Sequence, residues 1–257
     1  MSGGADAQQA LERVQGDLEE GLKRVDSPQA ADVVVSRLEK EAAKVPTTPE
    51  TEPVVASVPR VREPRRKRGR RLLREAILRR MGPLHALDAE IYVAINEAPH
   101  PGALDSLAWA LALVTTGGWI WLIGALVAYL LRIPRSWRAF KRLLPSVVIS
   151  TWLIEYPIKT FFRRRRPFVR IVQALVVGKK PGSWSFPSGH TASSFASAWV
   201  LSSVWPRSAP VLFGLAGTVG FSRIYLGAHY PGDVASGAML GMLLAEMSRR
   251  GVKRLFP

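Results

Sequence analysis

Hydrophobic and polar positions divide the chain into a polar amino-terminal part and an apolar carboxy-terminal part. Residues 1–59 are rich in Ala, Glu, Gln, Ser, Thr and Pro, and only short stretches such as Val33–Val45 show helical spacing of apolar residues. The prolines between Pro46 and Pro59 indicate an extended linker. We therefore predict that residues 1–59 form a largely disordered or weakly helical tail, with a coiled-coil partner site as the alternative.

Long apolar runs begin at Ala103 and predict helices that span a membrane. The run Ala103–Leu131 has 29 residues, more than the roughly 20 that one span needs. Thr115–Gly118 divides it, which predicts either two short spans or one span with an interfacial lead-in. A short helix at Leu84–Asn96 precedes this run. Further spans are expected at Leu143–Phe162, Ser188–Trp205, Ala209–Leu226 and Pro231–Met247. The pattern predicts an all-α integral-membrane helical bundle of about six spans, or five.

Charge is concentrated in the segment that precedes the apolar runs. The formal net charge is +16, and Arg60–Arg80 holds eleven Lys and Arg residues against two Glu. In a soluble protein such a segment would indicate nucleic-acid binding, but before an apolar run it is typical of a juxtamembrane segment that attracts anionic lipid. We therefore expect a bilayer and no nucleic acid as partner. The expected organisation is a tail at 1–59, a basic juxtamembrane segment at 60–83, a membrane domain at 84–250 and a basic tail at 251–257.

The distribution of basic residues between the spans predicts the orientation in the membrane. Basic connections begin at Arg132 and at Trp205, and the chain ends in further Lys and Arg residues. Because basic loops stay in the cytoplasm, these ends and the amino-terminal tail are expected there, in a multi-pass protein of the cell membrane. The basic loop Arg163–Lys180 is then the exception on the outer side, which a functional need for cations would explain. No cleavable signal peptide is expected, and the absence of cysteine excludes disulfides and Cys-based metal sites.

Three polar clusters lie at the ends of apolar runs that face outward in this topology. The first consists of Lys159 and the run Arg163–Arg166. Lys159 lies one helical turn after Glu155, so an ordinary ion pair within one helix accounts for it. Four adjacent arginines present planar donors suited to phosphate oxygens, although a solvated basic loop has the same composition. This cluster alone leaves anion binding and solvation open.

The second cluster, Pro187–His190, is placed to open a long apolar helix. Ser188 suits the N-cap position, and Gly189 allows close approach of the backbone. The amide groups and the dipole at such a helix end attract anions. His190 would stand beside a bound phosphate, or it is an ordinary interfacial histidine with satisfied hydrogen bonds.

The third cluster joins the end of one expected span to the start of the next, with Arg223 before the turn and His229 and Asp233 after it. Pro231 suits the first position of a helix, which places Asp233 in the first turn. Asp233 can accept from one nitrogen of His229 and leave the other as nucleophile or base. The plainer alternative is a capping Asp and an interfacial His.

A zinc site formed by His190, His229 and Asp233 is a weaker alternative. The nearby cations Lys159, Arg166 and Arg223 would repel a divalent metal ion and attract an oxyanion.

Together these clusters resemble the three-part signature of the type 2 phosphatidic acid phosphatase superfamily, over roughly Leu84–Arg250. The matching residues are Lys159-x6-Arg166-Pro167, Pro187-Ser188-Gly189-His190 and Ser222-Arg223-x5-His229-x3-Asp233. The resemblance implies His229 as the nucleophile that takes the phosphoryl group, Asp233 as the residue that orients it, and His190 as the general acid. It also implies that the phosphate is held by Lys159, Arg166, Ser188, Gly189 and Arg223.

The resemblance further implies an enzyme without metal or cofactor that acts on a lipid phosphate or diphosphate at the extracytoplasmic face. The alternatives for the substrate are undecaprenyl diphosphate, phosphatidic acid or phosphatidylglycerol phosphate, and the sequence does not choose among them. Vanadate-dependent haloperoxidases are similar at these motifs but soluble. A non-catalytic membrane anchor that presents Arg65–Arg71 is the alternative from another class.

Overall fold

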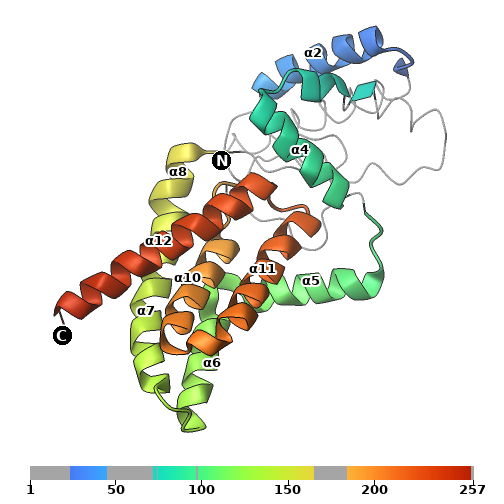
Figure 1. The fold of residues 1–257 in the computed structure, drawn as a ribbon. Helices are drawn as coiled ribbons and strands as arrows, with labels where there is room; N and C mark the ends of the chain where they lie inside the picture. Colours follow the sequence, from blue (N-terminus) through green and yellow to red (C-terminus); the bar gives the residue numbers. More distant parts are fainter. Residues whose placement is uncertain (1–23, 45–71, 74, 97, 165–183, 256–257) are drawn as a thin grey trace, which may run out of the picture. The chain divides into compact units, whose positions relative to one another are not determined.

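A computed structural model describes residues 24–44, 72–73, 75–96, 98–164 and 184–255, and every regular element in these ranges is a helix. The chain divides into two compact units, with the boundary after Ala98. Figure 1 shows the helices in chain order. The segment Arg60–Arg71 and residues 165–183, which include Arg166 and most of the basic loop Arg163–Lys180, lie outside the described residues.

The first unit contains α2 (Pro28–Lys44), helical residues at 72–73 and 75–79, and α4 (Pro83–Asn96). The helix predicted at Leu84–Asn96 is confirmed by α4. α2 begins earlier than the weak helix expected at Val33, because the Ser27 hydroxyl accepts the Ala30 N–H at 3.2 Å and caps it. Its apolar side is buried against Leu73 and Ala76, in a cluster with Val25, Ala31 and Val35. The described part of the tail is thus a packed helix. The residues that bury its apolar side are distant in sequence, so the local pattern did not predict this packing.

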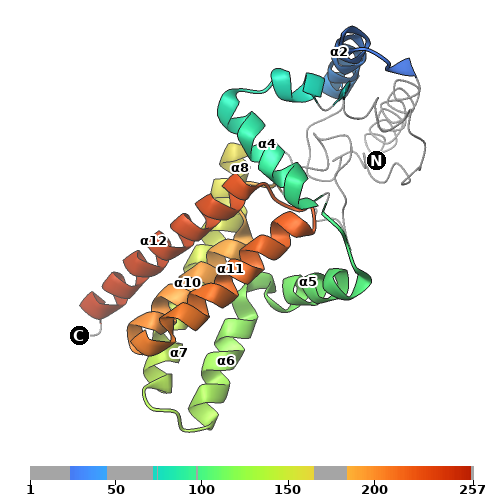
Figure 2. The same ribbon diagram turned by 45° about the vertical axis from the view of Figure 1, so that its right-hand side comes forward.

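The second unit is a helical bundle built around α10. Its elements are α5 (Gly102–Val114), η1 (Thr116–Gly118), α6 (Trp119–Leu130), α7 (Ser136–Leu153), η2 (Ile154–Ile158), α8 (Lys159–Phe162), α10 (Gly189–Val204), η3 (Pro206–Ser208), α11 (Ala209–Tyr225) and α12 (Pro231–Leu255). Helix α10 packs against α7, α11 and α12 (Figures 1 and 2). The runs expected as spans after Leu143 are therefore helices of this bundle.

Small residues let the helices around α10 approach closely. The buried face of α10 consists mainly of Ala and Ser, including Ala192, Ser193 and Ala196. On α12, a Cβ atom at Gly237 would lie 2.6 Å from the Ser188 carbonyl oxygen, and one at Gly241 would collide with the Ala192 backbone. The start of α12 is thereby held against the start of α10.

Helices α7 and α8 form one continuous run through the π-helical turn η2. Pro157 lies within that turn and lacks the N–H that a regular α-helix would use at this position. The wider turn carries the chain from α7 to Lys159 without a break in the helical path.

The Ala103–Leu131 run is broken where the sequence predicted, and its two halves differ in direction. Gly117 and Gly118 adopt φ values of 63° and 76°, a left-handed conformation that glycine tolerates. Among the described helices, none passes a test of length and hydropathy for a membrane span by itself, and only α5 with η1 and α6 passes jointly, as a pair bent by 51°. The single-helix spans expected after Leu143 do not meet that criterion.

Polar side chains fasten the start of α5 to the end of α11. Asp105, the one charged residue of the apolar run, accepts the Tyr225 hydroxyl at 2.7 Å and lies 2.8 Å from Nδ1 of His100. The His100 ring stacks on Tyr225 with centroids 4.2 Å apart. These contacts fix the start of α5 against α11. The other end of α5, near Ala112, reaches the candidate site.

Candidate active site

Lys159 is buried at the start of α8, and its ammonium group is paired with a carboxylate. Its Nζ donates to both oxygens of Glu155 at 2.7 and 2.8 Å, which confirms the pairing within one helix that the spacing predicted. The Glu155 carboxylate also lies beside α10, because a Cβ atom at Gly189 would collide with it. The first and second motifs therefore meet at the amino end of α10.

The start of α10 is fixed mainly by backbone contacts. Ser188 occupies the N-cap position, but its side chain makes no capping hydrogen bond, and its hydroxyl instead accepts that of Thr191 at 2.9 Å. The Ser188 N–H donates to the carbonyl of Asp233 at 3.0 Å. This bond joins the second motif to the third.

His190 is held by the end of α5. Its Nε2 lies 3.1 Å from the carbonyl of Ala112 and 3.3 Å from the hydroxyl of Thr116. A carbonyl oxygen can only accept, so Nε2 carries a proton and Nδ1 is the nitrogen that can exchange one. The Thr116 hydroxyl donates to the same Ala112 carbonyl at 3.0 Å, so it accepts from Nε2.

His229 is held through its Nδ1 atom, whereas His190 is held through Nε2. Its Nδ1 lies 2.7 Å from the carbonyl of Ser185, so Nδ1 carries the proton and the lone pair is on Nε2. The turn before α12 fixes its backbone, since the carbonyl of Arg223 accepts the N–H groups of Ala228 and His229 at 3.0 and 3.2 Å. This tautomer is the one that a nucleophilic Nε2 requires.

Asp233 is completely buried in the first turn of α12, as the sequence predicted. Its Oδ2 accepts the Tyr230 N–H at 2.9 Å, and its Oδ1 accepts from the Arg164 guanidinium at 2.5 Å. The distance from Oδ2 to Nδ1 of His229 is 3.8 Å, longer than a hydrogen bond. The carbonyl of Ser185 thus receives the imidazole proton, and the Asp233 carboxylate acts on the ring at slightly longer range.

The three motifs converge on one site. Arg223, His229 and Lys159 all lie within electrostatic reach of His190, and Arg223 is buried. Every residue predicted for the site except Arg166 is described. These residues lie at the start of α8, at the start of α10, and between the last turn of α11 and the first turn of α12. Within the described ranges, no group of three or more His, Asp and Glu residues is arranged to hold a metal ion, so the weaker zinc alternative has no ligand set there.

Sequence reasoning missed four contributors to this site. Arg164 belongs to the arginine run that was noted, but nothing distinguished it from its neighbours. Ala112 and Ser185 act through backbone carbonyls, which leave no trace in the sequence. Thr116 contacts a residue 74 positions away. No local signal could have identified these contacts.

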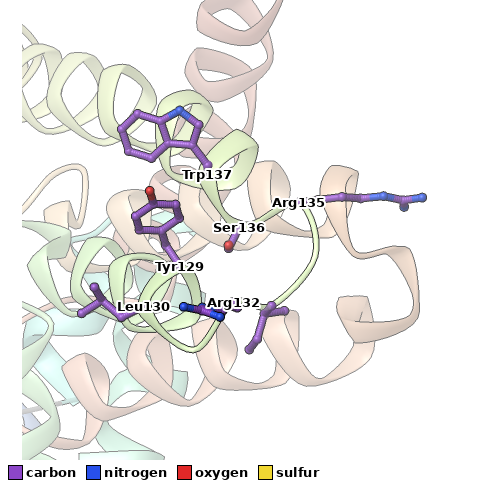
Figure 3. A pocket seen from close by; sticks show the side chains of 7 residues that line it. Tyr129, Leu130, Arg132, Arg135, Ser136 and Trp137 are labelled. Atoms are coloured by element: carbon purple, nitrogen blue, oxygen red, sulfur yellow. The ribbon is translucent and has the colours of Figure 1, made fainter.

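A separate pocket lies at the α6–α7 turn, away from the motifs. It has a volume of about 430 Å³ and is lined by Tyr129, Leu130, Arg132, Ile133, Arg135, Ser136 and Trp137. Figure 3 shows Tyr129 and Trp137 on one side and the Arg135 side chain directed away from them. The turn is at the opposite end of α7 from Lys159, so this pocket is not part of the candidate site (Figure 1).

Comparison with known proteins identifies the family. The sequence profile of the PAP2 superfamily matches residues 139–256. The crystal structure of Aquifex aeolicus LpxE is similar with a TM-score of 0.55 and 30% identity, covering 64% of this chain and 95% of that one. The chain belongs to the PAP2 superfamily. The resemblance drawn from the three motifs is thereby confirmed.

Two further proteins show how much of the chain the similarity covers. The first transmembrane PAP2-type phosphatidylglycerolphosphate phosphatase from Bacillus subtilis shares the fold, with a TM-score of 0.50, 18% identity and coverage of 73% of this chain and 96% of that one. Lipid A 4'-phosphatase of Bacteroides thetaiotaomicron is 29% identical over 138 residues, which are 49% of this chain. The match spans 61% of the length of that relative.

Proposed function

We propose that this PAP2 protein is an integral-membrane phosphatase that hydrolyses a lipid phosphate or diphosphate through a phosphohistidine intermediate on His229. The observation that carries the proposal is the pair of histidines with opposite tautomers. His229 has its lone pair on Nε2, whereas His190 has Nδ1 available for proton exchange. One histidine can therefore attack while the other supplies a proton.

The proposed chemistry proceeds in two balanced steps. Nε2 of His229 forms a bond to phosphorus, the bond from phosphorus to the leaving oxygen breaks, and protonated His190 gives its Nδ1 proton to that oxygen. Water then attacks phosphorus, His190 takes a proton from the water, and the bond to His229 breaks to release phosphate. Lys159, Arg223, Ser188 and Gly189, with Arg166, would hold the phosphate oxygens, and Asp233 would stabilise positive charge on His229.

The surface of the second unit supports a location in a bilayer. Large apolar side chains point outward on several helices, among them Ile123 on α6, Trp152 on α7, Leu215 on α11 and Leu243 on α12. Such extensive apolar exposure is typical of a lipid-facing surface. The likeness in fold to the transmembrane PAP2-type phosphatase of Bacillus subtilis agrees with it.

We further propose that the bundle crosses the cell membrane several times, with the site at the outer face and the α6–α7 turn in the cytoplasm. Arg132 and Arg135 at that turn, beside Tyr129 and Trp137, match the basic and aromatic residues typical of a cytoplasmic membrane boundary. Six spans would require α5 and α6 to cross separately. Both ends of α5 contact the site end of the bundle, through Asp105–Tyr225 and Ala112–His190, so in this arrangement α5 does not cross.

The first prediction tests the nucleophile. His229→Gln should abolish phosphate release in detergent without added metal, since an amide cannot form the covalent intermediate. The substrates to compare are undecaprenyl diphosphate, phosphatidic acid, phosphatidylglycerol phosphate and a lipid A phosphate, each labelled with ³²P. Wild-type protein should form an acid-labile, base-stable phosphoprotein that His229→Gln lacks. Retention of activity in this variant would refute the mechanism.

A further inference from the structure

Arg164 contacts both residues that lie against the Nδ1 side of His229, namely Asp233 and Ser185. The three-motif signature gives Arg164 no role. It is the second residue of the arginine run 163–166. Its guanidinium donates to Oδ1 of Asp233 and lies over the Tyr230 ring, with Cζ 4.3 Å from the centroid. Its side chain is 19% exposed, whereas that of Asp233 is 0% exposed. Arg164 therefore brings a positive charge to a fully buried carboxylate.

The physical need for this charge follows from the burial of Asp233. A buried carboxylate is strongly disfavoured unless it is paired and hydrogen-bonded, and its nearest histidine nitrogen is 3.8 Å away. The Arg164 guanidinium lets Asp233 remain ionised without taking the Nδ1 proton of His229. That proton is then available to the Ser185 carbonyl, which holds the ring at 2.7 Å.

The backbone of Arg164 supports the same imidazole by a second route. Its carbonyl accepts both the N–H and the hydroxyl of Ser185, at 2.8 and 3.0 Å. The carbonyl of Ser185 in turn accepts from His229. Arg164 thus acts on His229 from two sides, through Asp233 by its side chain and through Ser185 by its backbone.

We propose that Arg164 is a positioning residue that fixes the orientation and tautomer of His229, and that it is not a ligand of the phosphate. This inference rests on the proposed role of His229 as nucleophile. The neighbouring Arg163 offers a matched control, because it is exposed and its Nε donates to the Thr160 carbonyl of its own helix. The two adjacent arginines of one run therefore differ in function.

The first experiment needs no substrate and measures the apparent melting temperature of the full-length protein in detergent. Arg164→Gln should lower this temperature by about 5 °C or more, because Asp233 loses a charge partner. Adding Asp233→Asn should recover part of the loss, since the buried charge is removed with its partner. Arg163→Gln should change the temperature little, alone or with Asp233→Asn. Additive effects of Arg164→Gln and Asp233→Asn would overturn the coupling.

The second experiment separates positioning from phosphate binding. Arg164→Gln should lower kcat roughly 10- to 100-fold, the range typical of residues that orient a reacting group, with little change in KM. The inhibition constant of inorganic phosphate should also stay near the wild-type value. Arg164→Lys should restore part of kcat, because it keeps the positive charge. The recovery should be incomplete, because an ammonium group lacks the planar donor geometry of the guanidinium. A rise in KM and in the phosphate inhibition constant at unchanged kcat would assign Arg164 to substrate binding and overturn the proposal.

The two experiments fail independently. If wild-type protein releases phosphate from no lipid phosphate, the proposed function is wrong, while the melting temperatures still decide whether Arg164 and Asp233 are coupled. If the protein is active and Arg164→Gln behaves as Arg163→Gln in both kcat and melting temperature, the positioning role is wrong and the proposed function stands.

Discussion

His190 lies in the first turn of α10 and His229 in the turn before α12, and each is oriented by a carbonyl oxygen from another segment. The carbonyl of Ala112 receives Nε2 of His190, and that of Ser185 receives Nδ1 of His229. Because these oxygens can only accept, each ring has one defined exchangeable nitrogen. The exchangeable nitrogen is Nδ1 in His190 and Nε2 in His229. This difference suits a reaction in which one imidazole attacks and the other donates a proton.

A second prediction concerns Thr116, whose hydroxyl accepts from His190. Thr116→Val keeps the shape but removes this hydrogen bond, so kcat should fall about 2- to 10-fold, the equivalent of one hydrogen bond. Thr115→Val is the control, because the Thr115 hydroxyl donates to Leu111 of its own helix at 2.7 Å. Steady-state rates with the best lipid phosphate check this. Equal losses in both variants would mean that Thr116 acts only through the stability of the α5 end.

The site was predictable to the extent that its residues follow from local spacing. The pair Glu155–Lys159 and the place of Asp233 in the first turn of α12 could be read from helix periodicity and from Pro231. The contact between Asp233 and Arg164 spans 69 positions and depends on how the helices pack. Helix propensity and motif spacing contain no information of that kind.

The packing of α12 on α10 sets the separation of the two histidine-bearing segments. Gly241 lies against the backbone of Ala192, so even one methyl group at this position must push the helices apart. Gly214 on α11 has no neighbouring atom within 4 Å of its Cβ position. Glycines of equal helix propensity therefore differ in their tolerance of alanine.

This difference supplies a third prediction. Gly241→Ala should lower the melting temperature and the activity, with a cost of about 1–3 kcal/mol from overpacking. Gly214→Ala should leave the protein unchanged or stabilise it by up to about 1 kcal/mol, because alanine favours a helix. Thermal unfolding in detergent compares the two variants. A stabilised Gly241→Ala would show that α12 is not closely held against α10.

The sequence predicted the bounds of the helices better than the angles between them. Apolar runs and prolines predicted α4, α10, α11 and the start of α12 within a few residues, and Thr115–Gly118 marked the break before α6. The bend of 51° at that break depends on the backbone angles of two glycines and on the attachment of Asp105 to Tyr225. These features arise from tertiary contacts, as does the packing of α2.

Orientation in the membrane is a property of the whole molecule, and the absence of cysteine makes it accessible to labelling. Our fourth prediction is that a membrane-impermeant maleimide labels Arg163→Cys in intact cells. Arg207→Cys should react only after the cells are permeabilised, because η3 lies at the basic end expected in the cytoplasm. Both positions are exposed. The reverse labelling pattern would place the site in the cytoplasm.

The two carbonyl groups that hold the histidines also limit what mutagenesis can reveal about this protein. Every amino acid carries the same carbonyl group, so a substitution at Ala112 or Ser185 leaves the acceptor in place and reports only what the side chain does, such as the bond of the Ser185 hydroxyl to the Arg164 carbonyl. The same property protects the protein during evolution, since no single codon change can delete either acceptor. The position of these carbonyl groups depends on the path of the main chain. A change that shifts this path, such as an insertion in the turn before α6, would remove the acceptor from His190.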